Sequence, residues 1–201
     1  MNRPYYMEVL SELTELDGFH SRAYMDERSR WYWRQTAEFL EHHVRKNAMI
    51  LDAGCGYGTL GLELMARGFT GVYSMDRDAD KVSITQKLYR RLGYSPEKVS
   101  IGDIFEIGPT WGAIIAMEVL YDLDRPLEKL FNLIKNNLER TGYFIFTEIS
   151  WEINPKPKRQ YMGIMDVLSS ITANGFRVEE YHVRWIKNFN QNVWYACQRE
   201  S

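Results

Sequence analysis

Three alternating glycines are the feature of this sequence with the clearest chemical meaning. An apolar run ends at Asp52, the segment Gly54-Cys55-Gly56-Tyr57-Gly58 follows, and a helical pattern begins at Thr59. Glycines allow a tight turn and the close approach of a ligand to the backbone, and unpaired N–H groups at a helix start favour a negative group. The segment therefore predicts a nucleotide-type cradle, although an ordinary turn between a strand and a helix also fits it.

Two more acids follow the next two strand patterns. Asp76 stands eighteen positions after Gly58, at the end of an apolar run, where a carboxylate can accept hydrogen bonds from both hydroxyls of a ribose. Asp103 follows the third run, where a carboxylate beside apolar side chains can accept from the exocyclic amine of adenine. Each acid alone also fits a solvated turn residue. Three acids at successive strand ends together predict a site for an adenine nucleoside.

Short apolar runs alternate with helical patterns from Ala48 onwards, which is typical of a parallel sheet with crossover helices. We expect strands at residues 48–52, 71–75, 99–101, 113–117, 143–148, 176–186 and 193–199. We expect helices at residues 59–67, 79–92, 127–139 and 161–174, which stop at Gly68, Gly93, Gly142 and Gly175.

The connection between the last two predicted strands is too short for a crossover helix, so these strands should pair antiparallel. The pattern predicts the α/β class: a Rossmann-like three-layer α/β/α sandwich, with a seven-stranded, mostly parallel sheet and a C-terminal antiparallel hairpin. Ligands of such sheets bind beyond the carboxyl ends of the strands.

Two amphipathic patterns precede the sheet, at residues 5–16 and 21–45, and they predict two helices. The length of 201 residues suits one core. We therefore expect a single domain, 1–201, in which residues 1–46 form a helical cap and residues 47–201 form the Rossmann-like core.

Composition narrows the function classes. The net charge of −2 provides no basic field for a phosphate backbone, so a nucleic-acid partner is disfavoured. The sequence shows no apolar run of membrane length and no secretory signal pattern, so we expect no membrane partner. The two cysteines are far apart, which predicts neither a disulfide framework nor a metal site and favours the cytoplasm. The oligomeric state is left open.

The acids and glycines quoted above resemble the motifs of class I S-adenosylmethionine-dependent methyltransferases, over about residues 47–148. The resemblance implies a methyltransferase with S-adenosylmethionine as cofactor and S-adenosylhomocysteine as product. It implies these cofactor-binding residues: Asp52, Gly54, Cys55, Gly56, Gly58, Asp76, Arg77, Asp103, Ile104 and Glu118. Asp52 would order the loop beneath the amino group of the cofactor, Asp76 would hold the ribose, and Glu118 would lie near the sulfonium.

The stretch Glu118-Val119-Leu120-Tyr121-Asp122-Leu123 is similar to that of small-molecule methyltransferases, including the nodulation N-methyltransferases. It departs from the Asn-Pro-Pro-aromatic motif of enzymes that methylate adenine N6 or glutamine amides. We therefore expect a small-molecule acceptor, with nitrogen preferred. The candidate catalytic residues are Glu118, Tyr121 and His20, and the candidate substrate-binding residues are Tyr24, Tyr121 and Trp151.

Two other functions stay open at this point. A non-catalytic S-adenosylmethionine-binding partner or regulator would carry the same binding residues, because methyl transfer needs little acid–base machinery. An NAD(P)-dependent oxidoreductase shares the strand, the glycine loop and the acid at position 76. Its fingerprint is G-x-G-x-x-G, however, and here the three glycines alternate and Thr59 follows the last of them.

Overall fold

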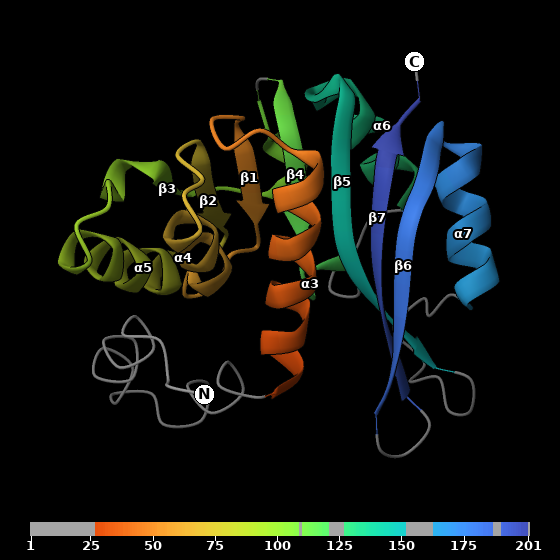
Figure 1. Ribbon diagram of the computed structural model, residues 1–201, viewed down its shortest axis with the longest axis horizontal. Coiled ribbons are helices and arrows are strands. Elements are labelled where there is room, and N and C mark those ends of the chain that lie inside the picture. The colour runs from red at the N-terminus through yellow and green to blue at the C-terminus, as the bar shows by residue number, and fades with distance from the viewer. Residues whose placement is uncertain (1–26, 109, 121–126, 152–162, 187–189, 201) are drawn as a thin grey trace. The chain divides into compact units, whose positions relative to one another are not determined.

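The computed structural model describes residues 27–108, 110–120, 127–151, 163–186 and 190–200 (Figure 1). It describes side chains from Trp31 onwards within these ranges, except at residues 149–151 and 185–191. The chain falls into two compact units, Met1–Ile104 and Phe105–Ser201.

The first unit contains three parallel strands and the helices that connect them. Its elements are α3 (Glu27–His43), β1 (Ile50–Ala53), α4 (Thr59–Ala66), β2 (Val72–Asp76), α5 (Ala79–Arg91), the 3₁₀ turn η1 (Pro96–Lys98) and β3 (Val99–Ile101). The strand pairings Ile50 with Val72 and Ser74 with Val99 are parallel. The carboxyl ends of all three strands therefore lie at one edge.

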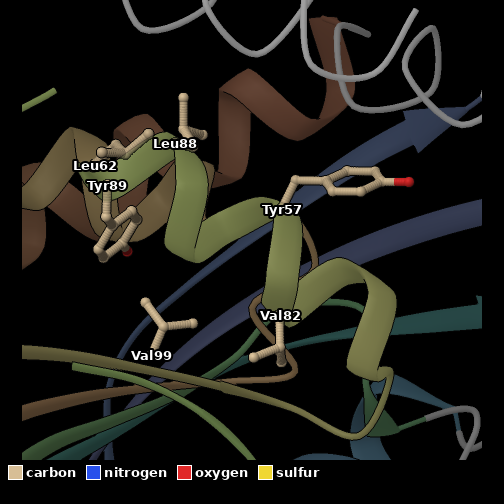
Figure 2. Close-up of a cluster of buried hydrophobic side chains, with 6 residues drawn as sticks. All are labelled: Tyr57, Leu62, Val82, Leu88, Tyr89 and Val99. Carbon is tan, nitrogen blue, oxygen red and sulfur yellow. The ribbon is translucent and has the colours of Figure 1, made fainter. Parts of the chain in front are cut away.

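Apolar side chains of α4, α5, β3 and the segment between β1 and α4 form the packing that supports this edge. They are Tyr57, Leu62, Val82, Leu88, Tyr89 and Val99, all buried (Figure 2). The start of α5 is fixed by Asp78, whose side chain accepts hydrogen bonds from the backbone N–H groups of Asp80 and Lys81. Gly68 and Gly93 follow α4 and α5 with positive φ, so both glycines end helices as predicted.

The second unit contains β4 (Trp111–Ala116), α6 (Leu127–Asn137), β5 (Leu138–Trp151), α7 (Ile164–Ala173), β6 (Phe176–Ile186) and β7 (Asn190–Arg199), and the turn η2 (Ile104–Glu106) precedes it. β4 and β5 are parallel, and β7 pairs antiparallel with both β5 and β6. Phe131 of α6 packs against Phe144, Phe146 and Phe176, with ring centroids 5.8–5.9 Å apart. These rings cover one face of β5 and β6.

The strand order is β3-β2-β1-β4-β5-β7-β6. The predicted Rossmann-like α/β fold, with seven strands and an antiparallel C-terminal hairpin, is confirmed. The predicted helix at 21–45 is present as α3, and the helix predicted at 5–16 lies outside the described residues. No helix in the described ranges is long and apolar enough to cross a membrane.

The prediction for Gly142 is wrong. We expected this glycine to end a helix, but α6 ends at Asn137 and Gly142 lies inside β5. The register between β4 and β5 shifts between Trp111 and Ala113, and a Cβ at Gly142 would lie 3.0 Å from the carbonyl oxygen of Trp111. A glycine at this position therefore fits the close approach of the two strands, and it does not end a helix.

Candidate functional site

The glycine loop connects β1 to α4 and is held by backbone hydrogen bonds. Gly54, Gly56 and Gly58 have φ values of 75°, 56° and 71°, a conformation that other residues rarely adopt. The N–H groups of Gly54 and Cys55 donate to the carbonyl of Met75 at 2.7 and 2.9 Å. The N–H of Gly58 donates to the carbonyl of Cys55 at 2.9 Å. The loop is thus attached to the end of β2.

Asp76 adds a side-chain bond to this attachment. Its Oδ2 accepts from the N–H of Gly56 at 2.8 Å, and its Oδ1 accepts from the N–H of Asp78 at 2.9 Å. The residue is only 8% exposed. Because each carboxylate oxygen has two lone pairs, both oxygens can still accept one further hydrogen bond. Asp76 therefore fits the ribose role while it holds the loop.

The carboxylate of Asp52, at the end of β1, lies where we expected a negative group of the ligand. We expected the start of the following helix to favour a negative group of the ligand. Instead, the backbone N–H of Gly61, in the first turn of α4, interacts with the Asp52 carboxylate and favours its ionised form. The protein therefore supplies its own negative group there. This arrangement disfavours the pyrophosphate of a nicotinamide cofactor, which binds at the corresponding helix start in dehydrogenases.

Asp52 is also electrostatically unusual. It is 2% exposed, and burial together with the charge of Asp76 raises the pKa of its carboxyl to about 7. Within the described part of the chain, its Oδ2 has no hydrogen-bond partner. A buried carboxylate with one open oxygen fits a cationic donor such as an ammonium group, and the amino group of S-adenosylmethionine is such a donor.

Two side chains of α5 support the glycine loop from behind. Thr85 Oγ1 donates to the carbonyl of Gly56 at 3.0 Å. The Tyr89 hydroxyl lies 2.8 Å from Ser74 Oγ and donates to the carbonyl of Gly58 at 3.4 Å. Sequence reasoning missed both residues. The available signal is that they share a buried helical stripe with Val82, where polar side chains need partners.

Removal of the Thr85 hydroxyl should disturb the loop. We expect Thr85→Val, which keeps the side-chain shape, to leave the Gly56 carbonyl with only the weak thiol donor Cys55 Sγ, at 3.7 Å, and to lower the free energy of unfolding by about 1 kcal/mol. The affinity of Thr85→Val for S-adenosylhomocysteine should be severalfold lower than that of the wild type. Thr85→Ser, which keeps the hydroxyl, should bind as tightly as the wild type. Thermal unfolding and calorimetric titration measure the two effects. Wild-type affinity in Thr85→Val would show that the loop does not depend on this bond.

The remaining predicted cofactor residues of this unit lie at the same edge. The N–H of Gly102 donates to the carbonyl of Asp76 at 3.1 Å, which keeps the segment after β3 beside the end of β2. Asp103 is half-buried, Ile104 is buried and Arg77 is exposed. The parallel register thus brings the carboxyl ends of the three strands, and the acids that close them, to one edge, as the spacing predicted.

Glu118 follows β4 in the second unit and has a strained backbone. Its φ is 57°, and across the described ranges no other residue except glycine has a positive φ. Its N–H donates to Thr147 Oγ1 at 2.7 Å, which holds this conformation in place. Backbone strain of this kind concentrates at functional sites.

The other predicted catalytic and substrate-binding residues cannot be placed. His20, Tyr24 and Tyr121 lie outside the described residues. Trp151 ends β5, and its side chain is outside the described part as well.

Comparison with known proteins identifies the family. A sequence model described as a methyltransferase domain matches residues 44–190 of the 201 residues. The chain belongs to the class I S-adenosylmethionine-dependent methyltransferases. The charge arrangement at Asp52 agrees with this membership.

Solved structures share the fold of this methyltransferase. Magnesium protoporphyrin IX methyltransferase (ChlM) from Synechocystis PCC 6803 with bound SAH is 16% identical over 97% of this chain and 100% of its own, with a TM-score of 0.73. Geranyl diphosphate C-methyltransferase from Streptomyces coelicolor A3(2) is 15% identical over 83% of this chain and 80% of its own, with a TM-score of 0.67.

A cyclase has the same fold. The [4+2]-cyclase SpnF is 14% identical over 83% of this chain and 80% of its own, with a TM-score of 0.70. A shared fold therefore does not determine the reaction, which depends on the residues of the site.

Proposed function

We propose that this methyltransferase transfers the methyl group of S-adenosylmethionine to a small-molecule acceptor, preferably on nitrogen. The environment of Asp52 is the observation that best supports this cofactor. Its carboxylate stands at the start of α4 and keeps one buried oxygen open for a cationic donor. When bound, S-adenosylmethionine supplies a methyl group activated by its positive sulfur.

We assign the following roles to residues of the first unit. Asp52 receives the amino group of the cofactor and orders the loop, and Asp76 accepts from the ribose hydroxyls. Asp103 and Ile104 contact the adenine. Glycine at position 56 lets the loop backbone approach the ligand closely, because no Cβ intervenes. The hydrogen bond from its N–H to Asp76 supports this assignment, since it couples the loop to the ribose-binding acid.

The acceptor side is assigned to the second unit. Glu118 places a carboxyl group directly after β4, and its held backbone conformation supports a positioning role. Tyr121, His20, Tyr24 and Trp151 remain predictions, as does the capping role of residues 1–46. A neutral amine needs only to be positioned in line with the methyl group and shielded from water, so the reaction does not require a strong base. The net charge of −2 supports a small molecule rather than a nucleic acid.

Substrates reported for structural neighbours support the acceptor class but not one compound. ChlM is a magnesium protoporphyrin IX methyltransferase, and the Streptomyces enzyme is a geranyl diphosphate C-methyltransferase. Both act on small molecules, and the two acceptors have little chemistry in common. The acceptor of this protein must therefore be found by experiment.

A direct test incubates the protein with S-adenosylmethionine and, separately, with small amines, alcohols, thiols and carboxylic acids. We expect S-adenosylhomocysteine to form with a subset of small molecules and fastest with amines. Turnover restricted to alcohols or carbon acids would contradict the nitrogen preference. Turnover restricted to a protein or RNA acceptor would contradict the small-molecule proposal.

Cofactor binding should depend on pH through Asp52. The pKa of about 7 means that below neutral pH the free protein carries this carboxyl protonated, and an incoming ammonium group requires it ionised. Affinity for S-adenosylhomocysteine should therefore fall by up to about tenfold for each pH unit below 7, with a proton released on binding. Asp52→Asn should weaken binding and remove this pH dependence.

Calorimetric titration at pH 6, in two buffers with different ionisation enthalpies, measures the proton released. The absence of proton release, together with a flat pH profile of binding in the wild type, would contradict the role of Asp52.

The same raised pKa of the Asp52 carboxyl affects folding with a defined sign. The stability that this group contributes is fully present below its unfolded pKa of about 4 and is lost as the pH rises to about 7.

A further inference from the structure

Asn192 of β7 is an exception to the usual pairing of buried polar groups. Its exposed fraction is 0%, and neither its Nδ2 nor its Oδ1 has a hydrogen-bond partner in the ranges that the structure describes. Buried amides in folded proteins are almost always paired, because an unpaired donor or acceptor destabilises the fold. Such a group points to a partner outside the chain.

The strand register fixes the face on which this amide lies. β7 pairs antiparallel with β5, and Thr147 stands opposite Trp194. Side chains alternate along a strand, so Asn192, Trp194 and Thr147 share one face. The opposite face carries Phe144 and Phe146, against which Phe131 of α6 packs. The amide is thus on the face away from α6.

A short path connects the amide to Glu118. Thr147 Oγ1 accepts the N–H of Glu118, and Asn192 is the diagonal cross-strand neighbour of Thr147. Such neighbours lie about 7–8 Å apart, within reach of one small molecule. Asn192 also pairs with the residue that follows Glu148, close to the carboxyl end of β5, where ligands of parallel strands bind.

We infer that Asn192 binds the methyl acceptor and selects a planar group that presents an N–H donor beside a carbonyl acceptor. An asparagine side chain offers one acceptor and two donor hydrogens in a plane, which complements a carboxamide or a lactam. A hydrocarbon would leave both sides of the amide unpaired. This inference rests on the proposed small-molecule function and names the chemical class of the acceptor.

The test uses Asn192→Leu and a matched control, Asn137→Leu, in the same unit. The Asn137 amide is paired, because its Nδ2 donates to the carbonyl of Leu133 at 2.9 Å. Leucine at 192 removes an unpaired buried amide, so the Tm should rise by a few degrees. Asn137→Leu removes the hydrogen bond from the Asn137 amide to the Leu133 carbonyl, so the Tm should fall.

The binding arm uses nicotinamide and 3-acetylpyridine, which carries a ketone in place of the amide. Each is titrated by ligand-observed NMR into protein saturated with S-adenosylhomocysteine. The wild type should bind nicotinamide about tenfold more tightly, since the ketone keeps the carbonyl acceptor but lacks the N–H donor, so one hydrogen bond of ordinary strength, to Asn192 Oδ1, is lost. Asn192→Leu should lose this selectivity, Asn137→Leu should keep it, and S-adenosylhomocysteine affinity should be unchanged in both.

Three results would overturn the inference: equal binding of the two probes to the wild type, selectivity that survives in Asn192→Leu, or a lower Tm in Asn192→Leu. The last result would show that the amide has a structural partner such as a buried water. Failure of S-adenosylhomocysteine to bind the wild type is a different outcome. It would overturn the proposed function, and the inference with it.

Discussion

Asp76→Ala should weaken the binding of S-adenosylhomocysteine by about 5- to 150-fold, which corresponds to about 1–3 kcal/mol. The carboxylate is expected to accept charged hydrogen bonds from the ribose, and it also holds the N–H groups of Gly56 and Asp78 at 2.8 and 2.9 Å. Its loss therefore removes a ligand contact and releases the glycine loop. Calorimetric titration gives the affinity, and thermal unfolding gives the accompanying loss of stability.

Asp78→Ala is the matched control for this variant. Asp78 is a neighbouring acid that caps α5 and has a half-exposed side chain. Its loss should cost about 1 kcal/mol of folding stability, as for other helix caps, with S-adenosylhomocysteine affinity unchanged. Equal weakening of affinity by both variants would mean that the start of α5, rather than the Asp76 carboxylate, determines cofactor binding.

Gly58→Ala should abolish measurable cofactor binding. A Cβ at this position would lie 2.4 Å from Thr85 Cγ2 and 3.0 Å from Tyr89 Cε1, and the φ of 71° is unfavourable for alanine. The left-handed backbone alone costs about 1–2 kcal/mol, and the clash must also displace the loop from α5. Both effects act on the segment that we expect to contact the ligand. Titration with S-adenosylhomocysteine and thermal unfolding measure them.

Gly68→Ala separates the strain from the clash. Gly68 has a φ of 90°, and no atom lies within 4 Å of the position that its Cβ would take. This variant should lose a similar amount of stability from backbone strain while it binds the cofactor normally. In addition, Thr85→Ser should partly rescue Gly58→Ala, because it removes the methyl group at 2.4 Å. Normal cofactor affinity in Gly58→Ala would contradict the placement of the site at this loop.

Much of the fold follows from local patterns that the sequence displays directly. Alternating apolar runs and helical stripes predict a mostly parallel sheet with helical connections, because parallel neighbours need crossover helices. The order of the strands in the sheet comes from the structure. The acids at positions 52, 76 and 103 are recognisable for the same reason, since each directly follows such a run. Gly142 misled the prediction because a glycine at a helix end and a glycine at a strand contact look alike without the register of β4 and β5.

The contacts that position the site residues could not be predicted, because local sequence patterns do not show which side chain meets which backbone group. Thr85 lies 29 positions from Gly56, whose carbonyl it binds. The interaction of Asp52 with the N–H of Gly61 reverses the expected electrostatics of the helix start. Asn192 precedes the strand predicted at 193–199, so neither its place on β7 nor its burial was expected.

The most direct test of the account is calorimetric titration of the protein with S-adenosylmethionine, S-adenosylhomocysteine and NAD⁺ in parallel. The Asp52 carboxylate at the start of α4 should accept the amino group of the sulfur ligands and repel a pyrophosphate. We therefore expect one molecule of S-adenosylmethionine or S-adenosylhomocysteine to bind per chain and NAD⁺ not to bind. Binding of NAD⁺ without binding of either sulfur ligand would contradict the assigned cofactor and the role of Asp52.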